Sequence, residues 1–211
     1  MTISVASASV YFLVQSNSLN REALIASHRA WMKLTRYEIK SSLTWIKNER
    51  GDDVGQIEID FDVTNIGKSP ALNVWMDVEG YAGFFAPNEG YIRYQRLSRK
   101  ALDRPRSPGI GNTVFPEDRI ETRYGLSISP EAKAIGKGGR EIEMPISVLL
   151  VVGCVTYGLF VGKERRQTGF ALTIKDLDKN RLLRRIGPER IEVPTENLKF
   201  IRGIGDDTFA D

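Results

Sequence analysis

Apolar and polar side chains alternate along the middle of the chain. The residues from Gln56 to Thr64 read QIEIDFDVT, with apolar residues at every second position and acidic or other polar residues between them. This period of two predicts a half-buried strand of the antiparallel type, with one side in the core and the other in water. Leu72 to Glu79 alternates in the same way, and the stretch Asn65 to Pro70 between them has turn chemistry. The pattern predicts strand, turn, strand.

A second pattern predicts a strand that is buried on both sides. Ile146 to Val155 is almost wholly apolar and rich in β-branched residues, and it is about half as long as a membrane span. Gln167 to Ile174 follows as its predicted hairpin partner. Further strands are predicted at Trp31 to Ile39, Arg119 to Ile128 and Leu198 to Arg202. With the Gly and Pro residues between them, these segments predict a mainly β protein built as a two-layer antiparallel sandwich.

The long segment between residues 83 and 116 departs from the strand pattern and is strongly basic. A segment of this length inside a compact domain is often functional. Its part from Tyr91 to Leu102 has the composition of a short helix that stops before Pro105. Tyrosines lie among the basic residues, so the segment is a candidate for contact with anions or lipid headgroups; a solvated charged loop is the alternative. The candidate residues are Arg93, Arg96, Arg99, Lys100, Arg104 and Arg106.

The N-terminal end is uncharged and mildly apolar. No charged residue occurs from Met1 to Ser18, and the polar members of Ile3 to Val14 are serines. As a helix, Ile3 to Val14 rises roughly 18 Å, whereas the hydrocarbon core of a bilayer is about 30 Å thick. We expect either the trailing half of a transmembrane helix or a helix packed on the domain, and we favour the first. Basic residues such as Arg21 and Arg29 follow, and they predict an inner-membrane protein whose domain lies on the cytoplasmic side.

Composition argues against several kinds of chemistry. The chain has 211 residues and a formal net charge of +3, less than dedicated nucleic-acid-binding proteins usually carry. Its one cysteine, Cys154, cannot form an intrachain disulfide, and its one histidine, His28, cannot build a zinc site of the usual ligands. Cys154 lies in the most apolar strand and is expected to fill the core. A serine, histidine and aspartate triad would have no base other than His28.

Two motifs that suggest catalysis have simpler explanations. Gly67-Lys68-Ser69 is similar to the end of a phosphate-binding loop, but Asp62 stands where that loop needs a glycine, so a tight turn explains it better. Asp60 and Asp62 share one strand face about 7 Å apart, which would suit a metal ion, but a solvated strand face explains them better. We expect no cofactor, no metal and no small-molecule substrate. The alternatives are a soluble metal-dependent carboxylate enzyme, or a nucleic-acid-binding protein acting through Arg93 to Arg106.

Several segments together resemble a known group of proteins. They are Arg29-Ala30-Trp31, Asn65-Ile66-Gly67-Lys68-Ser69-Pro70-Ala71, Phe115-Pro116, Val151 to Tyr157, and Thr168-Gly169-Phe170. In this order they resemble membrane-anchored proteins of bacteria and their prophages, over roughly Val5 to Ile174. The resemblance implies an N-terminal hydrophobic helix followed by an immunoglobulin-like β-sandwich, in which Asn65 to Ala71 joins two strands. It implies a fold and no activity.

These patterns divide the chain into three parts. Residues 1–30 are expected to be a partial transmembrane helix and linker, and residues 31–202 a β-sandwich domain with a long insertion at about 83–116. Residues 203–211 are expected to be an acidic tail without fixed structure. We expect this chain to be a membrane-anchored, non-enzymatic binding or interaction module that contacts the membrane through Ile3 to Val14; its protein partner stays open.

Overall fold

The structure, a computed structural model, describes residues 29–83, 89–103, 112–131, 133–135, 141–143, 148–159, 165–177, 186, 188, 191–201 and 208–210. This part of the chain is mainly β, as predicted, with one α-helix. The strands are β1 (Met32–Ile39), β2 (Leu43–Lys47), β3 (Asp53–Asn65), β4 (Ala71–Gly83), β5 (Asn112–Val114), β6 (Arg119–Glu131), β7 (Lys133–Ile135), β8 (Glu141–Glu143), β9 (Val148–Leu159), β10 (Arg165–Asp176), β11 (Glu192–Val193), β12 (Leu198–Ile201) and β13 (Thr208–Ala210). The α-helix is α2 (Glu89–Asp103), and a 3-10 helix, η1 (Thr195–Asn197), precedes β12.

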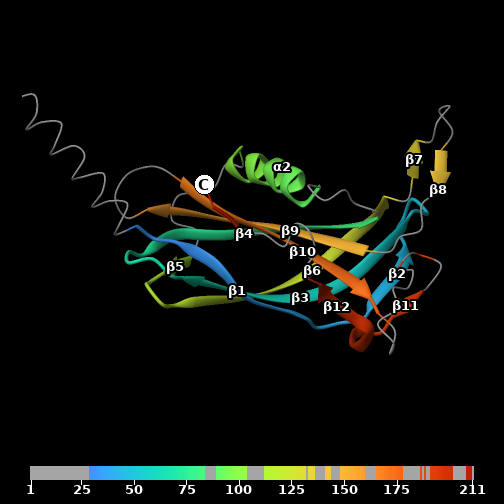
Figure 1. Ribbon diagram of the computed structural model, residues 1–211, viewed down its shortest axis with the longest axis horizontal. Coiled ribbons are helices and arrows are strands. Elements are labelled where there is room, and N and C mark those ends of the chain that lie inside the picture. The colour runs from blue at the N-terminus through green and yellow to red at the C-terminus, as the bar shows by residue number, and fades with distance from the viewer. Residues whose placement is uncertain are drawn as a thin grey trace, which may run out of the picture.

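One large sheet curves into a nearly closed barrel (Figure 1). Its strands follow the order β11-β2-β3-β6-β4-β9-β10-β12, and β1 pairs with β3 beside β2. The strands β4 and β6 run parallel, and their described pairing is confined to Tyr81–Gly83 against Ser129–Glu131. On the other side of the barrel, the rings of Tyr37 in β1 and Phe200 in β12 meet edge to face at 4.6 Å. Backbone hydrogen bonds therefore join β4 to β6 over part of their length, and the contact between the two aromatic rings joins β1 to β12.

The alternating segments form strands as their pattern predicts. In β3, Ile57, Ile59 and Phe61 are buried in the barrel core, and the ring of Phe61 lies 5.3 Å from that of Phe170 in β10. The predicted hairpin of β9 and β10 is confirmed as an antiparallel pair. The short strands β2, β5, β7, β8, β11 and β13 were not predicted, because they are too short to show a period. The immunoglobulin-like arrangement stays a prediction.

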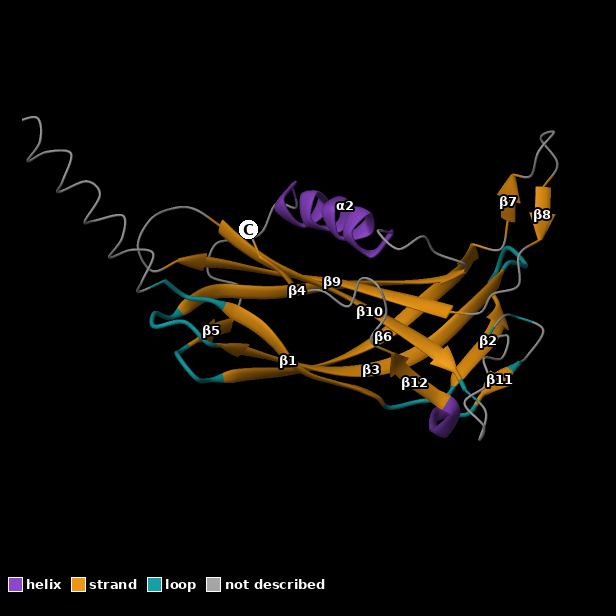
Figure 2. Ribbon diagram, in the orientation of Figure 1, coloured by secondary structure: helices purple, strands orange, loops and turns teal. Residues whose placement is uncertain are grey.

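The strand β9 is covered on both sides, as its continuous apolar run predicts. Val151 points into the barrel core, whereas Val152 and Cys154 pack against Tyr94 and Leu97 of α2. Figure 2 shows α2 lying across the outer face of the barrel beside β4 and β9. This helix contains the segment predicted to be helical, and it buries residues spaced by three and four positions. Cys154 is a buried free cysteine, as expected of a core residue.

The turn between β3 and β4 is organised by Asn65, whose side chain is fully buried. Its Oδ1 accepts from the backbone N–H groups of Trp31 and Gly67, at 3.1 and 3.0 Å, and its Nδ2 donates to the carbonyls of Ser69 and Val114, at 2.8 and 2.9 Å. A side chain at Gly67 would come within 2.3 Å of the carbonyl oxygen of Arg29, so only glycine lets these two segments approach. The stretch that resembled a phosphate loop is a tight turn.

Two expectations are corrected here. In the described residues, no helix is long and apolar enough to cross a membrane. The helix α2 has only 15 residues and exposes Arg96 and Arg99. The transmembrane helix and the inner-membrane location are therefore predictions that the structure contradicts; Ile3 to Val14 itself lies outside the described residues. The acidic tail is also not wholly without structure, because Thr208–Ala210 pairs with β10 as β13.

Candidate functional site

The outer face of β1, β2, β3 and β6, called here the bare face, carries no described helix and changes character halfway along its strands. Outward side chains on β6 are long and charged up to Arg123, and then small and neutral from Gly125 to Ser129. The facing strand β3 changes one pair later: Asp60 lies opposite Arg123 and Glu58 opposite Gly125, and only Gln56, opposite Ser127, is neutral. Because the strands are in register, the bare face has a charged half and a neutral half.

Ion pairs fill the charged half. Arg123 holds Asp60 with two bonds, 2.7 Å from its Nε to Oδ1 and 3.1 Å from its Nη2 to Oδ2. The hydrogen bond from Arg123 is the main reason that the pKa of Asp60 lies below its ordinary value, and it raises the pKa of Arg123 in turn. Lys40 likewise donates to Glu38 at 2.8 Å and lowers the pKa of that carboxyl. The charges here neutralise one another across the strands.

Asp60 and Asp62 do not converge on a common site. The side chain of Asp62 is 7% exposed and lies between two guanidinium groups, 4.0 Å from Arg36 and 3.8 Å from Arg119. Among the residues that the structure describes, no group of three or more His, Cys, Asp or Glu side chains lies close enough to hold a metal ion. The predicted outward direction is right for both acids, but the predicted exposure to water is wrong for Asp62, which its neighbours on β1 and β6 bury.

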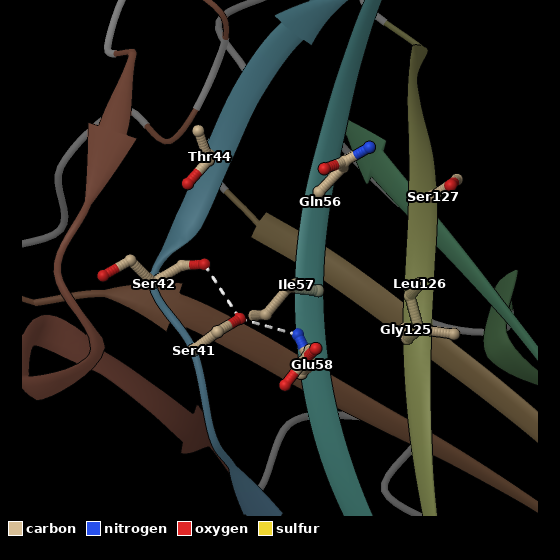
Figure 3. Close-up of a pocket in the computed structure, with 9 residues that line it drawn as sticks. All are labelled: Ser41, Ser42, Thr44, Gln56, Ile57, Glu58, Gly125, Leu126 and Ser127. Carbon is tan, nitrogen blue, oxygen red and sulfur yellow. Dashed lines mark hydrogen bonds between the residues drawn. The ribbon is translucent and has the colours of Figure 1, made fainter.

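The neutral half contains an open hollow of about 550 Å³, called here the sheet hollow. Its lining comprises Ser41, Ser42, Thr44, Gln56, Ile57, Glu58, Gly125, Leu126 and Ser127. In Figure 3, Thr44, Gln56 and Ser127 stand in a row across β2, β3 and β6, as the strand register requires. The hollow exists because the side chains around Gly125 are short, whereas those on the charged half are long.

Backbone and side-chain bonds set the floor of the sheet hollow. Where β1 gives way to β2, the hydroxyl of Ser41 accepts from the backbone N–H of Glu58 at 2.8 Å and donates to the carbonyl of Ser42 at 3.1 Å (Figure 3). In the described part of the chain, the side chains of Thr44, Gln56 and Ser127 form no hydrogen bond with protein. These three side chains can therefore both donate to and accept from a bound molecule.

A second hollow, called here the seam hollow, lies where β4 and β6 diverge and measures about 400 Å³. It is lined by Val78, Glu79, Gly80, Tyr81, Tyr124, Gly125, Leu126, Ser127 and Ser129. The hydroxyl of Tyr124 donates to the carbonyl of Met76 and so links the two strands across the gap. Gly125, Leu126 and Ser127 line both hollows.

One wall of the seam hollow is held rigid by α2. Arg93 stacks over the ring of Tyr81 at 3.9 Å, and Lys100 lies 2.6 Å from the carboxylate of Glu79. The hydroxyl of Tyr81 donates to the same carboxylate at 2.5 Å. Burial, together with this bond to Glu79, raises the pKa of Tyr81 to about 12, so the phenol stays protonated at neutral pH.

The basic residues proposed for anion contact do not form a single surface. Arg93 is buried and pairs with Glu89 at 2.8 Å, and Lys100 is engaged by Glu79. Arg96 and Arg99 are exposed on α2. Arg104 and Arg106 lie outside the described residues, as does His28. Two of the four described candidates therefore serve to attach the helix.

Sequence reasoning missed the sheet hollow. Gln56 and Glu58 were placed on the wet side of a strand, but Thr44 lies in a strand that was too short to predict, and Ser127 was not singled out. The available signal was the change from Arg, Glu and Arg to Gly and Ser along outward positions of Arg119 to Ile128. This change indicates a hollow only once the register of β3 and β6 shows which residues lie beside it.

Comparisons of this chain with known protein families, with curated proteins and with solved structures found no match.

Proposed function

We propose that this protein is a non-enzymatic binding module whose ligand-binding surface is the sheet hollow. The observation that carries the proposal is the row of Thr44, Gln56 and Ser127, three hydrogen-bonding side chains in register around an open hollow of about 550 Å³. Its volume is that of ordinary small-molecule sites, which span roughly 300 to 1,000 Å³. A mainly β scaffold with a rigid, in-register face suits recognition, in line with the immunoglobulin-like module that the resemblance implies.

The chemistry of the lining favours binding over catalysis. Hydroxyl and amide groups recognise a ligand by hydrogen bonds and supply no strong acid or base at neutral pH. Of the described residues that line the sheet hollow, Glu58 alone carries a carboxylate. The metal-dependent enzyme receives less support, because Asp60 and Asp62 lie among guanidinium groups. Nucleic-acid binding receives less support as well, since Arg93 and Lys100 are engaged within the protein.

The test is to locate binding by nuclear magnetic resonance. The full chain, labelled with ¹⁵N, is titrated with a panel of neutral mono- and disaccharides, nucleotides, short peptides and Mg²⁺. We expect the amide shifts of Thr44, Gln56 and Ser127 to move with at least one neutral probe, and that probe to be recovered unchanged.

A matched pair of variants tests the position. T44V with S127V removes two hydroxyls from the sheet hollow, whereas T35V with T64V removes two from the charged half, where they bond each other at 2.9 Å. We expect the first pair to abolish the shifts and the second to keep them. Shifts confined to Arg96 and Arg99 with nucleotides, or conversion of the probe, would contradict the proposal.

A further inference from the structure

The sheet hollow and the seam hollow are two parts of one trough. Gly125, Leu126 and Ser127 line both of them, so β6 forms a low saddle between a floor on β2 and β3 and a wall on β4. From β2 across β3 and β6 to β4, the trough takes three steps of at least about 4.8 Å each, which makes it at least about 14 Å long. A ligand that fills the trough is therefore elongated and runs across the strands.

Gly125, at the saddle, has no explanation within the fold. It is exposed in the middle of β6, in regular register opposite Glu58, without a bulge and without a positive φ. In the part of the chain that the structure describes, a Cβ built at this position would meet no atom within 4 Å. A glycine inside a strand weakens it and often marks the close approach of a ligand or another backbone.

Other strand glycines show the contrast. A Cβ at Gly169 would lie 2.0 Å from the ring of Tyr94, and one at Gly153 would lie 2.0 Å from the ring of Phe170. A Cβ at Gly80 would lie 2.8 Å from the side chain of Ile128. The fold itself needs these glycines because a neighbour occupies the space. At Gly125 the same space is open, and it lies over the trough.

The lining of the trough indicates the chemistry of its ligand. Among the described residues that line the two hollows there is no Lys, Arg or His. The charged lining residues are Glu58 and Glu79, and Glu79 is held by Lys100 and Tyr81. An anion would meet these carboxylates without a cation to bind it. Hydroxyl and amide groups, which donate and accept alike, fit a ligand that is rich in hydroxyls.

We propose that the trough binds an uncharged, hydroxyl-rich chain, an oligosaccharide, which crosses β6 directly over Gly125. This inference rests on the proposed function, because the sheet hollow is one half of the trough. Gly125 is then a specificity-determining residue: its missing side chain lets one ligand occupy both hollows, whereas a side chain there would divide the trough in two.

The experiment measures affinity against chain length by isothermal titration calorimetry. The probes are neutral linear oligosaccharides of β-1,4-linked glucose and of N-acetylglucosamine, from the disaccharide up to the hexasaccharide. We expect the longer chains to bind about tenfold more tightly than the disaccharide, as one or two further hydrogen bonds imply. In G125T this advantage is lost, and the disaccharide binds as it does to the wild type.

The controls make each outcome informative. G125T places a β-branched residue in a strand where no described atom obstructs it, so it folds at least as well as the wild type. G158T, in β9, alters another strand glycine away from the trough and keeps the wild-type length dependence. If the disaccharide binds at Thr44 and Ser127 but neither length nor G125T matters, the trough is wrong and the proposed function stands. If no saccharide binds there, or if a neutral Gly-Ser peptide binds instead, the proposal that the ligand is an oligosaccharide is wrong. If no ligand of any kind binds at the sheet hollow, both proposals are wrong.

Discussion

The barrel has two outer faces that differ in what covers them: a helix covers one, and water covers the other. On β9 and β10 the outward side chains are mostly apolar, and α2 covers them with Tyr94, Leu97 and Ala101. On β3 and β6 the outward side chains are polar, and water covers them. The residues of a strand therefore indicate whether one or both of its sides are buried. They do not indicate which distant segment of the chain covers the second side.

Polar groups also behave differently on the two faces. Under α2, Gln167 is buried, and its amide nitrogen Nε2 donates to the carbonyl of Ser98 at 3.0 Å and to the hydroxyl of Thr156 at 3.2 Å. On the bare face, Asp60 and Arg123 pair in contact with solvent, which weakens such a pair. The buried bonds under α2 are therefore expected to contribute more to stability than the solvent-exposed ion pairs of the bare face.

The largest expected effect comes from removing the cover's main apolar side chain. Leu97 is 4% exposed, so L97A should lower the free energy of unfolding by about 2 to 4 kcal/mol through lost burial and a residual cavity. Leu102, on the same helix, is 43% exposed, and L102A should change the free energy of unfolding by less than about 0.5 kcal/mol. Urea denaturation followed by circular dichroism measures both. Equal losses would show that α2 is not the cover described here.

The next largest difference in stability between the two faces is expected for substitutions of two strand glycines, Gly169 and Gly125. G169A would push a methyl group against the ring of Tyr94 under α2, at a cost of about 1 to 3 kcal/mol. G125A on the bare face meets no described atom and should stabilise the protein by up to about 1 kcal/mol, because glycine is a poor strand residue. Thermal unfolding of both variants is the measurement. A destabilised G125A would mean that the fold itself requires this glycine.

An alkaline titration probes the contact between α2 and β4. The pKa of Tyr81 is raised from 10.0 to about 12, so its neutral form stabilises the fold fully below pH 10, and this contribution is lost as the pH rises towards 12. We expect Y81F to be less stable than the wild type at pH 9, because it lacks the bond to Glu79, and to lose less stability between pH 10 and 12. Urea midpoints across this range test the prediction, and parallel curves would contradict it.

The smallest effect is expected in the charged half of the bare face. Arg123 lowers the pKa of Asp60 below its ordinary value of 3.8, so the ionised carboxylate stabilises the fold above that pH, and the contribution disappears as the pH falls through the folded-state pKa. D60N should be slightly less stable than the wild type at pH 7, with the difference shrinking in acid. Urea midpoints of both proteins at pH 7 and pH 3 test this prediction. A stability difference that grows in acid would show that ionised Asp60 does not stabilise the fold.

Much of the fold was predictable because its signals are local. The alternation of Gln56 to Thr64, the apolar run that forms β9 and the helix within α2 all depend on neighbours within a few residues. The candidate site was not predictable in this way. Thr44 and Ser127 are far apart in the sequence, and their row depends on the register of β2, β3 and β6.

The sequence by itself determined which residues seek the core and which seek water, since side-chain hydrophobicity and the period of two act locally. Tertiary structure alone decided that β4 meets β6 in parallel, that Asp62 is enclosed by Arg36 and Arg119, and that residues of β2, β3, β6 and β4 line one trough. The physical reason is that backbone hydrogen bonds can pair almost any two strand edges. Only the simultaneous packing of a whole barrel selects the pairing and register, and with them the site.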